Sequence, residues 1–108
     1  MATAADLRRI ALGLEGTTEA PHFDRAAFKA ARIYVTLAAN GLTANLKLTP
    51  DEQELKCLVA PQIFAAIDNA WGRQGWTEMT LAPATSEDLL AALQTAYAHA
   101  LPKSKKRS

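Results

Sequence analysis

The N-terminal part of the chain combines a helical pattern with a polar connection. Apolar side chains recur at i, i+3, i+4 and i+7, which places them on one side of an amphipathic helix. These positions are Leu7, Ile10, Ala11 and Leu14. Thr3 precedes Asp6 by three residues, as in a capping box, and the pattern predicts a helix from there to Gly13. Residues 17–25 are mostly polar, so we expect an irregular connection there, followed by a short extended piece at 27–30.

The middle of the chain alternates between apolar and polar residues, the pattern of half-buried strands. Residues 33–38 and 43–48 flank the dipeptide Asn40-Gly41. These two residue types suit the positive φ angles of a two-residue type I′ turn. The pattern therefore predicts a β-hairpin.

That turn determines which residues of the hairpin face each other. Every pair in one phase is apolar, so that side is predicted to face the core. These pairs are Leu37–Ala44, Val35–Leu46 and Ile33–Leu48. The other phase pairs Thr36 with Asn45 and Tyr34 with Lys47. We therefore expect the opposite side to be polar and to carry one aromatic ring.

A second helix is predicted after the hairpin. Thr49 and Glu52 have capping-box spacing around Pro50, which suits the first helical position. Three apolar residues are expected to form its buried side. They are Leu55, Leu58 and Val59. Residues 61–67 are expected to add one more helical turn.

Both tryptophans of the chain lie in the segment 71–76, directly before a strand-like stretch. Trp76 is in phase with the polar residues Glu78 and Thr80, and the opposite phase is apolar. Strand alternation therefore predicts that the Trp76 side chain lies on the polar side of the sheet. Thr85 has the residue type and position to cap a last helix.

Together these elements follow the order α-β-β-β-α-(α)-β-α. This order predicts an α+β fold in which helices are packed on one face of an antiparallel β-sheet. The other face of such a sheet is open to water or to a partner. A chain of 108 residues has the length of one domain. We expect residues 1–102 to form that domain and residues 103–108 to form a basic flexible tail.

Charge and composition narrow the range of functions. The formal net charge is +1, but four basic residues lie in the last six positions, so the preceding 102 residues carry a net charge of −3. A body of that sign is a poor general binder of nucleic acid. One cysteine and two histidines match no metal-ligand spacing, and we expect no metal and no cofactor. No signal peptide or membrane-spanning stretch is recognisable, so a cytoplasmic protein is expected.

Several segments resemble the MmcQ/YjbR-like family of small bacterial proteins. The similar pieces are residues 18–23, the end of the hairpin at 45–48, the tryptophan segment 71–76 and the closing helix. The resemblance covers about residues 4 to 102. It implies a fold similar to that of frataxin-type (CyaY-like) proteins and a DNA-binding role that has been described as a double-wing arrangement.

The open sheet face is the predicted binding surface. Its candidate residues are Tyr34, Asn45, Lys47, Trp71, Arg73 and Trp76. Aromatic rings beside lysine and arginine can stack on bases and contact phosphate. DNA is therefore the first candidate ligand, although Glu78 is expected on the same face.

Two other functions fit the same residues. The open face would also serve a protein–protein adaptor or a homodimer. A small-molecule enzyme would use His22 as a base, Asp24 to orient it and Arg25 beside them. No serine lies nearby as a nucleophile, and these side chains would otherwise bond the backbone and hold Phe23 against the core. A binding rather than a catalytic role is expected.

Overall fold

The computed structural model describes residues 1–101, which form four helices and six strands. The helices are α1 (Ala4–Gly13), α2 (Pro50–Val59), α3 (Ala70–Arg73) and α4 (Ser86–Ala98). The strands are β1 (Thr18–His22), β2 (Arg25–Lys29), β3 (Ile33–Leu37), β4 (Thr43–Lys47), β5 (Phe64–Ala66) and β6 (Trp76–Thr80). The predicted tail, residues 103–108, lies outside the described residues. None of these helices within residues 1–101 is long and apolar enough to cross a membrane.

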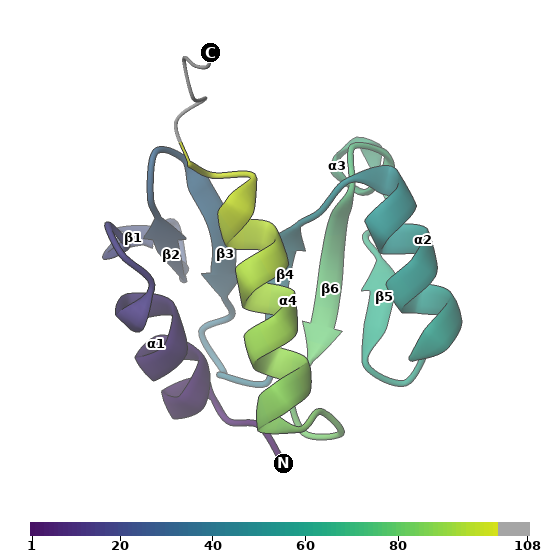
Figure 1. Ribbon diagram of the computed structural model, residues 1–108, viewed down its shortest axis with the longest axis horizontal. Coiled ribbons are helices and arrows are strands. Elements are labelled where there is room, and N and C mark those ends of the chain that lie inside the picture. Colours follow the sequence, from purple (N-terminus) through teal and green to yellow (C-terminus); the bar gives the residue numbers. More distant parts are fainter. Residues whose placement is uncertain (102–108) are drawn as a thin grey trace.

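All six strands form one antiparallel sheet in the order β1-β2-β3-β4-β6-β5. Helices α1, α4 and α2 lie on one face of this sheet (Figure 1). The predicted α+β fold with helices on one face of an antiparallel sheet is confirmed. Three helices begin with capping boxes in which a threonine pairs with an acidic residue three positions later. The predicted helix starts at Thr3, Thr49 and Thr85 are thus confirmed.

The hydrophobic core lies between the sheet and helices α1 and α4. Phe28, Val35 and Leu46 project from the strands, and Leu7 and Leu93 project from the helices. All five side chains are completely buried. The predicted hairpin register is confirmed by the β3–β4 pairs at positions 35 and 46, 36 and 45, and 37 and 44.

The position of Tyr34 differs from the prediction. A β-bulge shifts the β2–β3 register between Phe28 and Lys29, which breaks the alternation of β3. Tyr34 consequently lies on the helix side, where it is completely buried and its ring packs edge-on against Tyr97. Its hydroxyl is 2.8 Å from the Thr17 hydroxyl and also donates to the backbone carbonyl of Ala11 in α1. The prediction that Tyr34 shares the open face is therefore wrong.

Two segments form edge strands that the sequence pattern concealed. The polar connection predicted at 17–25 contains β1, which tolerates Pro21 because an edge strand leaves some N–H groups unpaired. The helical turn predicted at 61–67 is wrong, since a turn at 61–63 leads directly into β5. Both segments are too short and too irregular for a clear two-residue period.

Two local expectations also fail. Only Gly41 of the Asn40-Gly41 pair has a positive φ angle, so the turn is not of type I′, although the register that it was expected to produce is present. The apolar side of α2 was expected to be buried, but no residue of α2 is buried. Its three apolar residues are largely exposed. They are Leu55, Leu58 and Val59.

Candidate functional site

A groove with aromatic walls crosses the open face of the sheet, and we call it the aromatic groove. It encloses about 300 Å³. It is lined by His22, Phe23, Arg25, Thr36, Asn45, Ile67, Asn69, Trp71 and Trp76. The β1–β2 turn supplies one wall, and α3 with the loop before it supplies the other. Residues far apart in the sequence therefore meet across the sheet.

Short-range contacts hold Trp71 in its wall. The Asn69 side chain caps α3 by accepting hydrogen bonds from the backbone N–H groups of Trp71 (2.9 Å) and Gly72 (3.2 Å). A Cβ atom at Gly72 would lie 1.5 Å from the carbonyl oxygen of Ile67, so only glycine permits this close approach. The Trp71 side chain is nevertheless 61% exposed. The backbone at Trp71 is thus fixed, while its ring is not used to fill the core.

Trp76 is fixed at the start of β6. Gly75 has a φ angle of +107° and lies so close to the Leu48 carbonyl that a Cβ atom would be 1.9 Å from its oxygen. The Gln53 side chain donates to the carbonyls of Gly72 and Trp76, both at 2.9 Å, and so ties α2 to both ends of the segment. Trp76 is half-buried and lies on the open face, opposite Lys47 of β4. The predicted side for Trp76 is confirmed.

Phe23 forms part of the opposite wall. Phe23 and Asp24 are the two turn residues between the paired ends His22 and Arg25. Phe23 has a φ angle of +60°, and such an angle only at the first turn position is typical of a type II′ turn, which favours glycine there. Its ring is 94% exposed and lies edge-on to His22, with ring centroids 4.9 Å apart. The expectation that Phe23 packs against the core is wrong.

The floor of the groove is polar. The Arg25 guanidinium donates to the Thr36 hydroxyl (2.8 Å) and the Thr36 carbonyl (3.2 Å), which fixes its orientation over β3. Two of its N–H groups carry these bonds, and the others are available to a ligand. Asn45 lies opposite Thr36 on β4. The structure shows no hydrogen bond from the Asn45 side chain to another residue within 1–101.

The predicted binding residues divide into two groups. Trp71, Trp76 and Asn45 line the aromatic groove, and so do His22 and Arg25 of the loop proposed for an enzyme. The remaining predicted residues are outside the groove. They are Tyr34, Lys47, Arg73 and Asp24. Arg73 is exposed at the end of α3.

Sequence reasoning missed Phe23 and Asn69 as groove residues. An aromatic residue between two charged or polar neighbours, in a stretch that also contains Pro21, is the signal that would have indicated an exposed turn. Asn69 directly precedes a short helical segment, and its residue type is typical of a helix cap.

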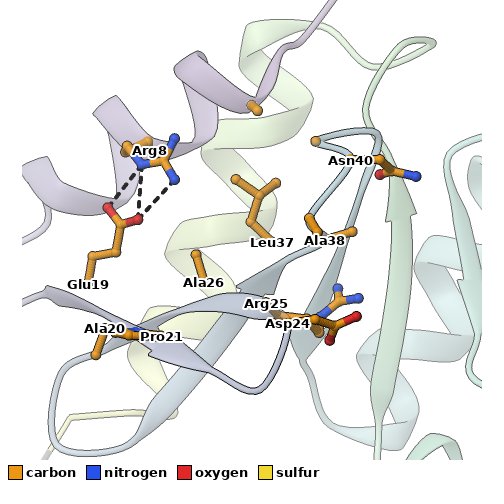
Figure 2. A pocket seen from close by; sticks show the side chains of 13 residues that line it. Arg8, Glu19, Ala20, Pro21, Asp24, Arg25, Ala26, Leu37, Ala38 and Asn40 are labelled. Carbon is orange, nitrogen blue, oxygen red and sulfur yellow. Dashed lines mark hydrogen bonds and ion pairs between the residues drawn. The ribbon is translucent and has the colours of Figure 1, made fainter.

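A second hollow lies at the end of the sheet on the helix side, between α1, the β1–β2 hairpin and the β3–β4 loop (Figure 2). It encloses about 590 Å³. Arg8 and Glu19 face each other there in a two-pronged ion pair with distances of 2.9 to 3.1 Å. Hydrogen bonding to Arg8 lowers the pKa of Glu19. Because the two charges satisfy each other, this ion pair offers little to a ligand.

The predicted catalytic loop does not converge. His22 lines the aromatic groove, Asp24 lines the second hollow, and Arg25 reaches both. No hydrogen bond joins His22 to Asp24 within the described residues. Among residues 1–101, no group of three or more histidine, cysteine, aspartate or glutamate side chains is placed to hold a metal ion.

Comparison with known proteins identifies a structural neighbour. The crystal structure of Deinococcus radiodurans protein DR2400, which contains a domain of the family model DUF419, is similar with a TM-score of 0.77. The two sequences are 25% identical, and the match covers 90% of this chain and 77% of that chain. No family model and no curated protein matches the sequence. This similarity supports a small α+β domain for the present chain, and the name of the neighbour gives no function.

Proposed function

We propose that this protein is a non-enzymatic binding module and that its ligand is single-stranded nucleic acid. The observation that carries the proposal is the aromatic groove, where Phe23, Trp71 and Trp76 surround a polar floor. Unpaired bases stack on such rings with little dependence on base identity. Arg25 and Asn45 supply donors and acceptors for the edges of a base.

The charge of the domain favours single strands over a duplex. Residues 1–102 carry a net charge of −3, so an extensive set of phosphate contacts is not available. Binding must therefore depend on stacking, which requires bases that are free of their partners. A paired duplex hides the faces of its bases, whereas a single strand presents them.

Intrinsic tryptophan fluorescence tests this proposal directly, because both tryptophans of the chain line the groove. We expect a single-stranded oligonucleotide to quench the emission and a duplex of the same sequence to leave it nearly unchanged. The affinity should fall only slightly with salt, with a slope that corresponds to about one or two phosphate contacts. Absence of quenching at low salt would eliminate the proposal.

The basic tail is the main competing source of nucleic-acid affinity. A full-length variant in which all four basic residues of the tail are replaced by serine separates the two sources. The replaced residues are Lys103, Lys105, Lys106 and Arg107. The aromatic groove accounts for binding if this variant still shows the quenching, and the tail accounts for it if the variant does not.

We also propose that the chain is an MmcQ/YjbR-like protein. The sequence resemblance, which includes the tryptophan segment 71–76, supports this assignment, as does the similarity to a small α+β domain. The DNA-binding role that the resemblance implies agrees with the proposed ligand class. A solved structure of an MmcQ/YjbR-like protein that lacks the β1–β2 hairpin and α3 would contradict the assignment.

A protein partner on the same face is the second candidate. The exposed apolar rings of Phe23 and Trp71 favour it, since exposed aromatic residues are typical anchors of protein interfaces. A homodimer would use this face in both copies. Light scattering at high protein concentration tests self-association, and a strictly monomeric mass would exclude the homodimer.

A further inference from the structure

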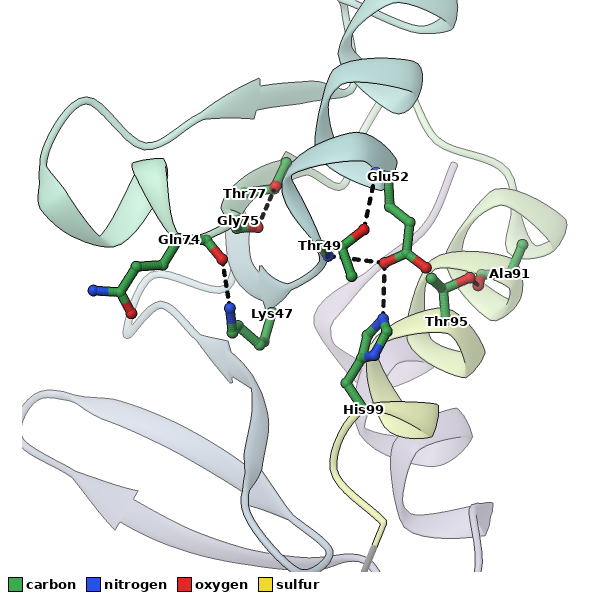
Figure 3. Close-up of polar contacts among 9 residues, drawn as sticks. All are labelled: Lys47, Thr49, Glu52, Gln74, Gly75, Thr77, Ala91, Thr95 and His99. Carbon is green, nitrogen blue, oxygen red and sulfur yellow. Dashed lines mark hydrogen bonds and ion pairs between the residues drawn. The ribbon is translucent and has the colours of Figure 1, made fainter. Parts of the chain in front are cut away.

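A third hollow lies where α2 begins and α4 ends, and we call it the basic hollow. It encloses about 560 Å³. Its lining includes Arg32, Lys47, Thr49, Gln74, His99 and Leu101. Three of these are basic or can become so, and no aspartate or glutamate lines the hollow. In Figure 3, Lys47 and His99 lie on either side of Thr49.

The basic hollow adjoins the aromatic groove. Lys47, which lines the hollow, is paired across the strands with Trp76, which lines the groove. Asn45 of the groove stands two residues before Lys47 on β4, so their side chains project from the same face about 7 Å apart. A ligand that fills the groove and extends along β4 therefore reaches the hollow.

The donors of the hollow are only partly used within the protein. The Lys47 ammonium donates to the Gln74 carbonyl, which holds it at the rim and leaves two of its three N–H groups available. The Arg32 side chain is exposed and shows no hydrogen bond to another residue within 1–101. Lys47 is therefore held in place with N–H groups to spare, and the N–H groups of Arg32 are unused within residues 1–101. Both side chains can donate to an anion.

The carboxylate in the first turn of α2 is already paired within the protein. Glu52 accepts hydrogen bonds from the Thr49 backbone N–H (2.9 Å) and from His99 (2.8 Å). Its carboxylate closes the first turn of α2, so the end of that helix is already capped and is not needed for the argument. Lys47 and Arg32 remain as the charges that face the hollow without an acidic partner.

We infer that the basic hollow binds the phosphate group of the same ligand whose base occupies the aromatic groove. This inference rests on the proposed function and assigns its second contact, a phosphodiester of the single strand. Lysine and arginine are the side chains that bind phosphate most often, through charge-assisted hydrogen bonds. The two sites together define a path along β4, with a base stacked at Trp76 and a backbone phosphate beyond Lys47.

The test compares two thymidine oligomers of equal length, one with phosphodiester linkages and one with uncharged methylphosphonate linkages. Both present the same bases, so both should quench the tryptophans. For the wild-type chain we expect the phosphodiester oligomer to bind about tenfold more tightly, the value of one hydrogen bond to a charged group. In the Arg32→Gln/Lys47→Gln variant the two oligomers should bind equally.

Matched controls locate the effect. Arg9→Gln and Lys56→Gln remove one arginine from α1 and one lysine from α2. Neither residue lines the hollow, so these variants should keep the tenfold preference. The serine variant of the tail should keep it as well. A double variant that still prefers the phosphodiester oligomer, or a tail variant that loses the preference, would overturn the inference.

The outcomes separate the two proposals. If neither oligomer quenches the fluorescence, the proposed function fails. If both bind the wild-type chain equally, the groove binds bases and the inference about the hollow fails. Should the double variant be unfolded, Arg32→Gln alone suffices, because this exposed side chain makes no internal bond within residues 1–101, and it should reduce the preference about threefold.

Discussion

The two faces of the sheet use aromatic residues in opposite ways. On the helix side, Phe28 and Tyr34 are completely buried, and the Tyr34 hydroxyl finds hydrogen-bond partners inside. On the open side, Phe23 and Trp71 remain largely exposed, and Trp76 is half-buried. Rings that leave this much surface in water contribute little to folding, and their placement supports the proposed binding role.

The open side also carries a conformational cost that the buried side does not. Phe23 occupies a left-handed backbone conformation, which is unfavourable for a bulky residue. Gly72 and Gly75 allow backbone approaches that no other residue would permit and so fix both tryptophans of the opposite wall. Strain and tight backbone contacts of this kind are concentrated at binding sites in many proteins.

The largest difference between the faces should appear in a pair of phenylalanine variants. Phe28→Ala should lower the free energy of unfolding by about 3–5 kcal/mol, because it removes a buried ring and leaves a cavity. Phe23→Ala should change it by less than about 0.5 kcal/mol, because its ring is exposed. Urea unfolding measures both. Equal losses would show that Phe23 belongs to the core.

A smaller effect is expected for the Tyr34 hydroxyl. Tyr34→Phe should destabilise the fold by about 1 kcal/mol, because it removes a partly buried hydrogen bond to Thr17. The affinity for single strands should not change, since Tyr34 lies under the helices. Tyr97→Phe is the matched control, and its effect should be smaller because its hydroxyl bonds at the surface. A loss of affinity in Tyr34→Phe would indicate that this residue contacts the ligand from the open face.

Replacing Phe23 by glycine should stabilise the fold slightly while weakening binding. Relief of the left-handed conformation contributes roughly 1–2 kcal/mol, and the greater freedom of glycine in the unfolded chain offsets roughly 0.5–1 kcal/mol of it. Thermal unfolding and oligonucleotide titration of the same sample give both quantities. A less stable variant would indicate that the ring makes contacts that stabilise the folded chain.

The smallest effect concerns acid stability. Burial raises the pKa of Glu52, but hydrogen bonds from Thr49 and His99 outweigh burial and leave the pKa below its usual value of 4.5. A carboxyl group with a lowered pKa in the folded state stabilises the protein above the pKa of the unfolded chain. That contribution disappears as the pH falls through the folded value.

Glu52→Gln should therefore make unfolding less dependent on pH in the acid range below 4.5. Glutamine keeps the capping geometry but carries no charge, so a small loss of stability should appear near neutral pH, where the carboxylate contributes. Part of the acid dependence should remain, because Asp6 and Glu19 also have lowered pKa values. An unchanged pH profile would show that Glu52 does not contribute.

Much of the fold could be predicted from periodicity and capping residues. The three capping boxes followed from the three-residue spacing of threonine and an acidic residue. The hairpin register and the side of Trp76 followed from strand alternation, which is strict in unbroken strands. Tyr34 could not be placed in this way, since a bulge adds one residue and reverses the alternation. No residue type in the sequence marks that bulge.

The site was only partly predictable. The strand that carries Trp76 and the hairpin that carries Asn45 indicated one half of the groove. The other half comes from the β1–β2 turn, whose strands are short, polar and interrupted by Pro21. Contact between these halves depends on the strand order of the whole sheet, which no local pattern determines.

The most direct test of the account is a single variant measured in two ways. Trp71→Ala should weaken binding of a single-stranded oligonucleotide about tenfold, the loss of one stacked base, and Trp71→Phe should retain most of the affinity. The free energy of unfolding should change by less than about 0.5 kcal/mol, because the side chain is 61% exposed. Unchanged affinity in Trp71→Ala, or a large loss of stability, would contradict the claim that the open face carries a binding site.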